Sequence, residues 1–358
     1  MLVYRVCLLL LPTLLLIFNS LIFNRWRLCI TVALITIYFT AYAIYLAPVG
    51  AALGGFILFV FLINLKCKYY EPLFFIIINI FSVVFFIGLI LYFLYTMNII
   101  DYVSIIKPIN TLKIEKGIYF KDVYFFLKVT STQYGDLYRF QSIFDEPGVV
   151  GTITGIAIIA MSSNERYKWQ RYIFITSGIL SLSTAFFLFY LISMIISFNF
   201  KKTVYIISSF TLMFVLSFYF INSTTFDAIQ PIIEYKLNAG DNRVSECFKS
   251  SFDRNIPDNI LFGLGKGATL ELGCDISSFV GSIYDYGYVG LFIIFLLVAL
   301  GYFSVFNGIY GSKTGINEIS NYMIWFVILV LNFYQRPDFF HPLLLIFGAG
   351  FYINKKPS

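Results

Sequence analysis

Long runs of apolar residues constrain this chain more than any other feature of its sequence. Three of them extend from Val6 to Phe23, from Pro72 to Met97 and from Tyr288 to Phe306, and none contains a charged residue. A helix that crosses a bilayer needs about 20 consecutive apolar residues, whereas a helix on the surface of a soluble protein keeps its apolar residues on one face. The runs therefore predict membrane-spanning helices.

The charge content supports this interpretation. Only 12% of the residues are charged and 59% are hydrophobic, against about 25% charged in soluble domains. The net charge is +6, but the Lys and Arg residues lie in small groups at the ends of apolar runs. This distribution sets orientation in a membrane and argues against nucleic acid as a partner, because no basic stripe forms.

The predicted fold is all-α: residues 1–358 form a single integral membrane domain, a polytopic bundle of about 10–12 embedded helices. The first apolar run lacks a small-residue cleavage site and is followed at once by further runs, so it is interpreted as a span rather than a signal peptide. The embedded segments are expected at 5–23, 28–46, 49–65, 72–97, 147–162, 171–198, 203–221, 285–307, 319–334 and 341–354.

The short connections between these segments carry most of the positive charge. The positive-inside rule places them in the cytoplasm, with the C-terminus, and places the N-terminus and two long polar loops, 98–146 and 222–284, outside. The basic residues concerned are Arg25 and Arg27; Lys66 and Lys68; Arg166, Lys168 and Arg171; Lys201 and Lys202; Lys313; and Lys355 and Lys356.

The run 171–198 has to leave and return to the same side in this topology, because basic connections flank it at both ends. Its 28 residues are too many for one upright span and too few for two. The polar patch Ser181–Thr184 predicts a break that makes two short helices of a re-entrant hairpin. The alternative is one long tilted helix.

Cysteine and histidine usage limits the metal chemistry. Cys247 and Cys274 share the second outer loop, where an oxidising exterior permits a disulfide, and the sequence leaves open whether they pair. His341 is the one histidine, and no Cys/His spacing is typical of a metal site. We expect neither a metal nor another cofactor.

The first cluster of polar residues, 139–148, leads into an apolar run that begins at Pro147, a residue that suits the first turn of a helix. Asp145 and Glu146 then lie where the helix dipole favours anions, and an ordinary acidic cap explains Asp145. Arg139, close to a lipid interface, requires an anionic partner, either Glu146 or a phosphate.

Two further clusters lie in or beside the second outer loop and the last outer connection. The glycine-rich stretch 262–267 contains Lys266 and is interpreted either as a phosphate cradle built from backbone N–H groups or as a flexible loop. The stretch 334–342 contains Arg336 and His341. Simpler interpretations are an Arg336 side chain that extends to the interface and a His341 that caps a helix.

The order of these motifs resembles the O-antigen polymerase and O-antigen ligase superfamily of bacterial envelope glycosyltransferases. The resemblance covers about residues 139–307. It rests on an Arg and a Glu-Pro that open a span, on a short Ser-containing hairpin, and on an outer loop with an Arg, a Gly-x-Gly and a Gly-x-x-Gly. In this chain they are Arg139 with Glu146-Pro147; Ser181–Thr184; and Arg243 with Gly263, Gly265, Gly287 and Gly290.

The resemblance implies a metal-independent inverting glycosyltransferase whose donor is a polyprenyl-pyrophosphate-linked oligosaccharide. Arg139 and Arg243 match the arginines that face the pyrophosphate, and Arg336 and Lys266 are further candidates to bind it. The catalytic base remains open among three carboxylates. These are Glu146, Asp275 and Glu271.

The expected function is polymerisation of repeat units on the outer face of a bacterial inner (plasma) membrane, in a multi-pass protein. The expected partners are the lipid-linked oligosaccharide, membrane lipid, a chain-length regulator and a flippase. A ligase is one alternative, although the residues 275–278 lack the histidine that ligases place there. A transporter or flippase is another, although its polar groups would lie within the spans.

Overall fold

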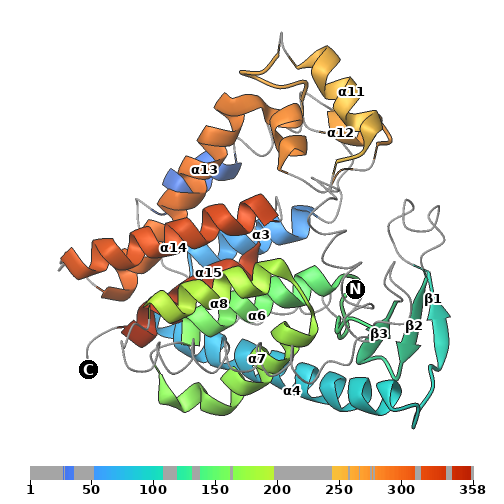
Figure 1. Cartoon of the computed structure of the whole chain (residues 1–358). Helices are drawn as coiled ribbons and strands as arrows, with labels where there is room; N and C mark the ends of the chain where they lie inside the picture. The colour runs from blue at the N-terminus through green and yellow to red at the C-terminus, as the bar shows by residue number, and fades with distance from the viewer. Residues whose placement is uncertain are drawn as a thin grey trace. The chain divides into compact units, whose positions relative to one another are not determined.

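The computed structural model describes residues 27, 29–35, 52–107, 119–130, 138–161, 164–196, 244–256, 259–265, 267–274, 276, 279–310, 316–335 and 341–355. The described residues are mostly helical, which agrees with the predicted all-α class (Figure 1). They fall into two compact units, one made of Met1–Ile77 with Arg243–Ser358 and the other of Ile78–Asn242. The predicted spans 5–23 and 203–221 lie outside the described residues.

Aromatic side chains fill the core of the first unit, where Phe306 stacks on Tyr352 with ring centroids 3.9 Å apart. Gly348 lets the last helix approach closely, because a Cβ there would lie 2.7 Å from atoms of Phe306 and Trp325. The helices that pack here are α3 (Ala52–Ile63), the 3₁₀ turn η1 (Cys67–Tyr69), α13 (Val280–Tyr310), α14 (Ile316–Gln335) and α15 (Pro342–Lys355).

The same unit contains α11 (Glu246–Asn255) and the single turn α12 (Ala268–Glu271). Ser245 caps α11, since its hydroxyl accepts from the backbone N–H of Phe248 at 3.3 Å. The disulfide that the sequence left open is formed: Cys247 is bonded to Cys274, with their Cα atoms 5.8 Å apart. It ties α11 to the chain that follows α12.

The second unit begins within α4 (Tyr70–Thr96) and continues through a small antiparallel sheet in the order β1 (Ser104–Ile106), β2 (Phe120–Val123), β3 (Leu127–Val129). Its remaining helices are α6 (Pro147–Met161), α7 (Lys168–Leu180) and α8 (Thr184–Ile196), with a 3₁₀ turn, η2 (Glu165–Tyr167), between α6 and α7. The sheet was not predicted, because the segment 98–146 was interpreted only as a polar loop.

Helices α6 and α8 lie side by side in Figure 1, and two glycines on α6 permit the close approach. A Cβ on Gly151 would overlap the side chain of Ser183, and one on Gly155 would lie 2.7 Å from the Cβ of Phe189. This small-x-x-x-small spacing is the one that membrane helices use to pack tightly. This spacing was not predicted from the sequence.

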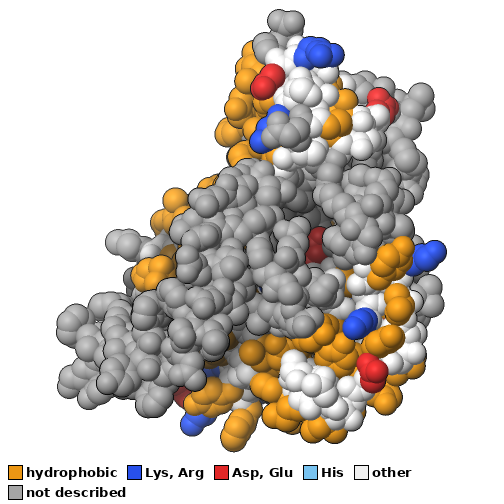
Figure 2. Space-filling model, turned by 45° about the vertical axis from the view of Figure 1, so that its right-hand side comes forward, with side chains coloured by type: hydrophobic (Ala, Val, Ile, Leu, Met, Phe, Trp, Pro, Cys, Tyr) orange, Lys and Arg blue, Asp and Glu red, His pale blue; other side chains and the backbone are white. Residues whose placement is uncertain are grey.

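Two helices in the described part of the chain are long and apolar enough to cross a membrane, Cys67–Thr96 and Val280–Ile309, each of 30 residues. Four shorter helices are also apolar: Pro147–Met161, Thr184–Ile196, Ile319–Tyr334 and Pro342–Asn354. On the face drawn in Figure 2, hydrophobic side chains dominate the lower described surface and charged side chains are isolated. These features support association with a membrane.

Candidate functional site

The apolar run 171–198 is interrupted where the sequence predicted a break. Helix α7 ends at Leu180 and α8 begins at Thr184. Between them Leu182 has a φ of 49°, a left-handed conformation that costs an L-residue about 1–2 kcal/mol. The alternative of one continuous tilted helix is therefore wrong.

Arg139 donates hydrogen bonds to the backbone carbonyls at this break. Its Nε donates to the carbonyl of Ser181 at 3.0 Å, and its Nη2 donates to the carbonyl of Leu182 at 3.2 Å. Just after it, the backbone N–H of Phe140 donates to the carbonyl of Leu180 at 3.0 Å. Carbonyls at the end of a helix have no partner within the helix, so Arg139 acts as a side-chain cap of α7.

The guanidinium of Arg139 retains binding capacity beyond this cap. Of the five N–H donors of a guanidinium, two are used, and the described residues accept no other hydrogen bond from it. Burial lowers the pKa of Arg139, and the nearby carboxylate of Glu146 partly offsets that shift. A half-buried cation with three remaining donors suits an anion that presents several oxygens.

Glu146 is the one predicted base that the described structure places next to a predicted arginine. It directly precedes Pro147, the first residue of α6, and its backbone carbonyl accepts from Val149 at 3.1 Å. The carboxylate therefore lies at the start of α6, and its charge acts on Arg139. Arg139 and Glu146 form the candidate site.

Gln141 is a functional candidate that was not predicted from the sequence. Its side chain is fully buried, and neither amide atom has a hydrogen-bond partner among the described residues. The following residue, Ser142, has a φ of 48° and its carbonyl accepts from Lys128 N at 2.8 Å. A buried unpaired amide carries a considerable desolvation cost, which marks the stretch beside Arg139 as unusual.

The glycine-rich stretch also has a structural role that was not predicted from the sequence. Helix α13 is broken at Gly287, which has a φ of 63°, and residues 259–265, the glycine turn, dock against the break. The N–H groups of Leu264 and Gly265 donate to the carbonyls of Tyr284 and Asp285 at 2.9 and 2.8 Å. These two N–H groups are unavailable to a phosphate, and their hydrogen bonds hold residues 259–265 in place. Lys266 lies outside the described residues, so a phosphate cradle that includes Lys266 stays a prediction.

The other predicted site residues do not join Arg139 in the described structure. Glu271 ends α12 and is exposed. His341 directly precedes α15, and its backbone carbonyl accepts from Leu344 N at 3.1 Å in the first turn of that helix. Four predicted residues lie outside the described ones: Arg243, Lys266, Asp275 and Arg336.

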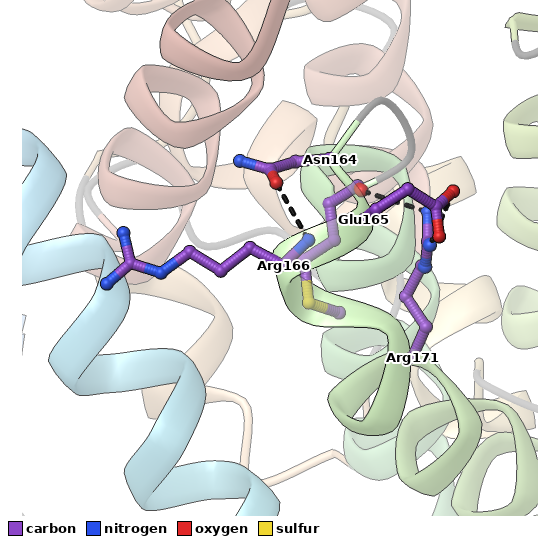
Figure 3. Close-up of polar contacts among 5 residues, drawn as sticks. Asn164, Glu165, Arg166 and Arg171 are labelled. Atoms are coloured by element: carbon purple, nitrogen blue, oxygen red, sulfur yellow. Dashed lines mark hydrogen bonds and ion pairs between the residues drawn. The ribbon is translucent and has the colours of Figure 1, made fainter.

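One ion pair in the second unit is structural. Arg171 contacts the exposed Glu165 at 3.5 Å and donates to the carbonyl of Met161, the last residue of α6, at 3.4 Å. Figure 3 shows this pair beside Asn164, whose side chain accepts from Arg166 N at 2.9 Å, while the Arg166 side chain points away from Arg171. An ion pair with one exposed partner contributes little stability, and this one orders the α6–α7 connection.

No family model matches the chain, and no curated protein or solved structure matches it either. Within the described residues, no group of three or more His, Cys, Asp and Glu side chains is arranged to hold a metal ion. A function therefore has to be argued from the residues themselves.

Proposed function

We propose that this chain is a multi-pass protein of a bacterial inner membrane that polymerises lipid-linked oligosaccharide repeat units on the outer face. The product would be a surface polysaccharide: an O-antigen, a capsule or an exopolysaccharide. The observation that carries the proposal is the guanidinium of Arg139, which two carbonyls hold at the α7–α8 break and which keeps three donors that no described residue engages. The order of the motifs along the chain supports the same assignment.

The reaction needs a positive group that stabilises the leaving pyrophosphate and a base that accepts a proton. An acceptor hydroxyl attacks the anomeric carbon of the donor glycan, the bond from that carbon to the pyrophosphate oxygen breaks, and the electron pair leaves with the polyprenyl pyrophosphate. Negative charge grows on the leaving group in the transition state. A preorganised guanidinium such as that of Arg139 stabilises it most where water is scarce.

A carboxylate accepts the proton of the attacking hydroxyl. Among the predicted bases in the described structure, Glu146 lies close enough to Arg139 to act on its charge, whereas Glu271 is exposed on α12. We assign Glu146 as the base. The burial around Arg139 further favours the reaction, because charges attract more strongly in a medium of low dielectric constant.

Deletion of the gene tests the proposal at the level of the cell. We expect the ladder of surface polysaccharide on a gel to disappear while a single repeat unit remains, and a plasmid copy of the gene to restore it. An unchanged ladder contradicts polymerisation. Loss of the single repeat unit as well indicates an earlier step, such as transfer of the repeat across the membrane.

A further inference from the structure

The glycine turn presents apolar side chains to the outside beside α13. Leu261 and Phe262 of the turn are 55% and 72% exposed, and Tyr288 and Phe292 of α13 are 53% and 68% exposed. We call these four residues, with Ile260, the loop–helix surface. An exposed apolar surface that is held in place indicates a binding face.

Backbone hydrogen bonds between the turn and α13 hold the surface in place. Tyr288 N donates to the carbonyl of Ile260 at 3.0 Å, and Val289 N donates to the carbonyl of Leu261 at 2.9 Å. Gly287 permits this approach, because a Cβ there would overlap the carbonyl of Leu261. The tip of the turn is thereby fixed at the level of the first helical residues after the break.

The length of α13 indicates the depth of that level in a bilayer. From residue 288 to residue 310 the helix has 23 residues, which at about 1.5 Å per residue span about 34 Å. The hydrocarbon core is about 30 Å thick. If this part of α13 crosses the membrane, Gly287 and the tip of the turn lie at the boundary between hydrocarbon and headgroups.

The distribution of charge agrees with this depth. Residues 259–265 and 287–310 contain no charged side chain. In the same unit, α11 carries the exposed side chains of Lys249, Asp253 and Arg254. Charged and apolar surfaces are thus separated within one unit, as they are in a protein that meets both water and lipid, and Tyr288 belongs to a residue type that is enriched at the boundary.

Several backbone polar groups of the turn are already hydrogen-bonded within the protein. Irregular backbone is excluded from hydrocarbon when its polar groups lack partners. Here the carbonyls of Ile260 and Leu261 accept from α13, and the N–H groups of Phe262 and Gly263 donate to the carbonyl of Asn259 at 3.2 and 2.7 Å. The tip can therefore face acyl chains without leaving these groups unpaired.

We infer that the tip of the glycine turn, Ile260–Phe262, inserts into the boundary of the bilayer and contacts lipid acyl chains beside α13. This inference rests on the membrane placement in the proposed function. The inserted turn fixes the depth of the break in α13.

Fluorescence quenching in vesicles tests the inference on the full-length protein. Three single variants, Phe262→Cys, Leu296→Cys and Arg254→Cys, are made in a background in which Cys7, Cys29 and Cys67 are serine and the disulfide is intact. Each is labelled with bimane and reconstituted in phosphatidylcholine vesicles. Quenching by brominated acyl chains reports contact with lipid, and quenching by iodide reports contact with water.

We expect brominated lipid to quench the probes at 262 and 296, and iodide to quench only the probe at 254. If the probe at 296 responds to brominated lipid and that at 262 responds like that at 254, the inference is wrong while the membrane placement stands. If neither responds to lipid, the membrane placement fails as well. A probe at 262 that neither agent reaches indicates burial against protein and also overturns the inference.

Discussion

Two arginines, one in each unit, donate to backbone carbonyls at the end of a helix, but they differ in how many of their N–H donors are engaged. Arg27 is only 3% exposed. Its Nη1 donates to the carbonyls of Ile63 and Leu65 at 3.1 and 3.0 Å, and its Nη2 donates to the carbonyl of Ser304 at 3.1 Å and to Sγ of Cys67 at 3.5 Å. Arg27 thus uses four contacts within the protein, at the end of α3 and on α13.

Arg139 also caps the end of a helix, but the described residues engage only two of its donors. A buried arginine with four of its five donors engaged is part of the framework, whereas one that keeps three donors unengaged by the described residues is suited to bind an anion. The comparison teaches that burial and a helix-capping role do not identify a functional arginine. The number of uncommitted donors separates the two cases.

The largest effect is expected from removal of Arg27. Arg27→Ala removes a donor from the carbonyls of Ile63 and Leu65, and an additional donor from the carbonyl of Ser304. Each buried acceptor left unpaired costs about 1–3 kcal/mol. We expect little folded protein in the membrane, and an early transition in thermal unfolding of what remains in detergent. A normal level and a normal transition contradict the structural role of Arg27.

The next effect separates function from folding at Arg139. Lysine keeps the charge but loses the planar fork, so Arg139→Lys is expected to slow polymer formation about 10²–10³-fold, with normal protein level and membrane insertion. The exposed Arg254 on α11 is the control, and Arg254→Lys retains the normal rate. The assignment fails if Arg139→Lys polymerises normally or if Arg254→Lys is equally slow.

The sequence indicated the break at Ser181–Thr184 because a polar patch inside an apolar run is a local feature. It did not reveal the role of Arg27, which was interpreted only as one of the basic residues of a short connection, since its acceptors lie 36 to 277 residues away. The docking of the glycine turn was not predicted for the same reason, because its hydrogen-bond partners lie in another element, α13. Strands of three or four residues are too short to show alternation.

The candidate site was predicted only in part. Arg139 and Glu146 were singled out because an arginine and an acidic residue flank the start of an apolar run. Gln141 was not, because no pattern around a single glutamine shows that it is buried without a partner. Arg243 stays a prediction from the resemblance, and Arg243→Lys is expected to match Arg139→Lys.

A smaller effect is expected from substitution of Gly151, which packs against the turn whose carbonyls accept from Arg139. Gly151→Ala forces Ser183 away, and with it the turn whose carbonyls hold the guanidinium. Overpacking costs about 1–3 kcal/mol, and we expect slower polymerisation in addition. Gly155→Ala is the matched control, since it crowds Phe189 one helical turn further on. Equal rates for the two variants contradict a link between this packing and Arg139.

Removal of divalent metal is expected to leave the rate of polymerisation unchanged. If the guanidinium of Arg139 supplies the positive charge that the leaving pyrophosphate needs, then purified protein with lipid-linked substrate keeps its rate in EDTA. The sequence supports this expectation, because it offers one histidine and therefore no site based on several histidines. The measurement is polymer length against time, with and without EDTA. Activity that vanishes with the chelator and returns with Mg²⁺ would mean that a cation, not the guanidinium alone, carries the pyrophosphate. Arg139 would then have to be regarded, like Arg27, as part of the framework.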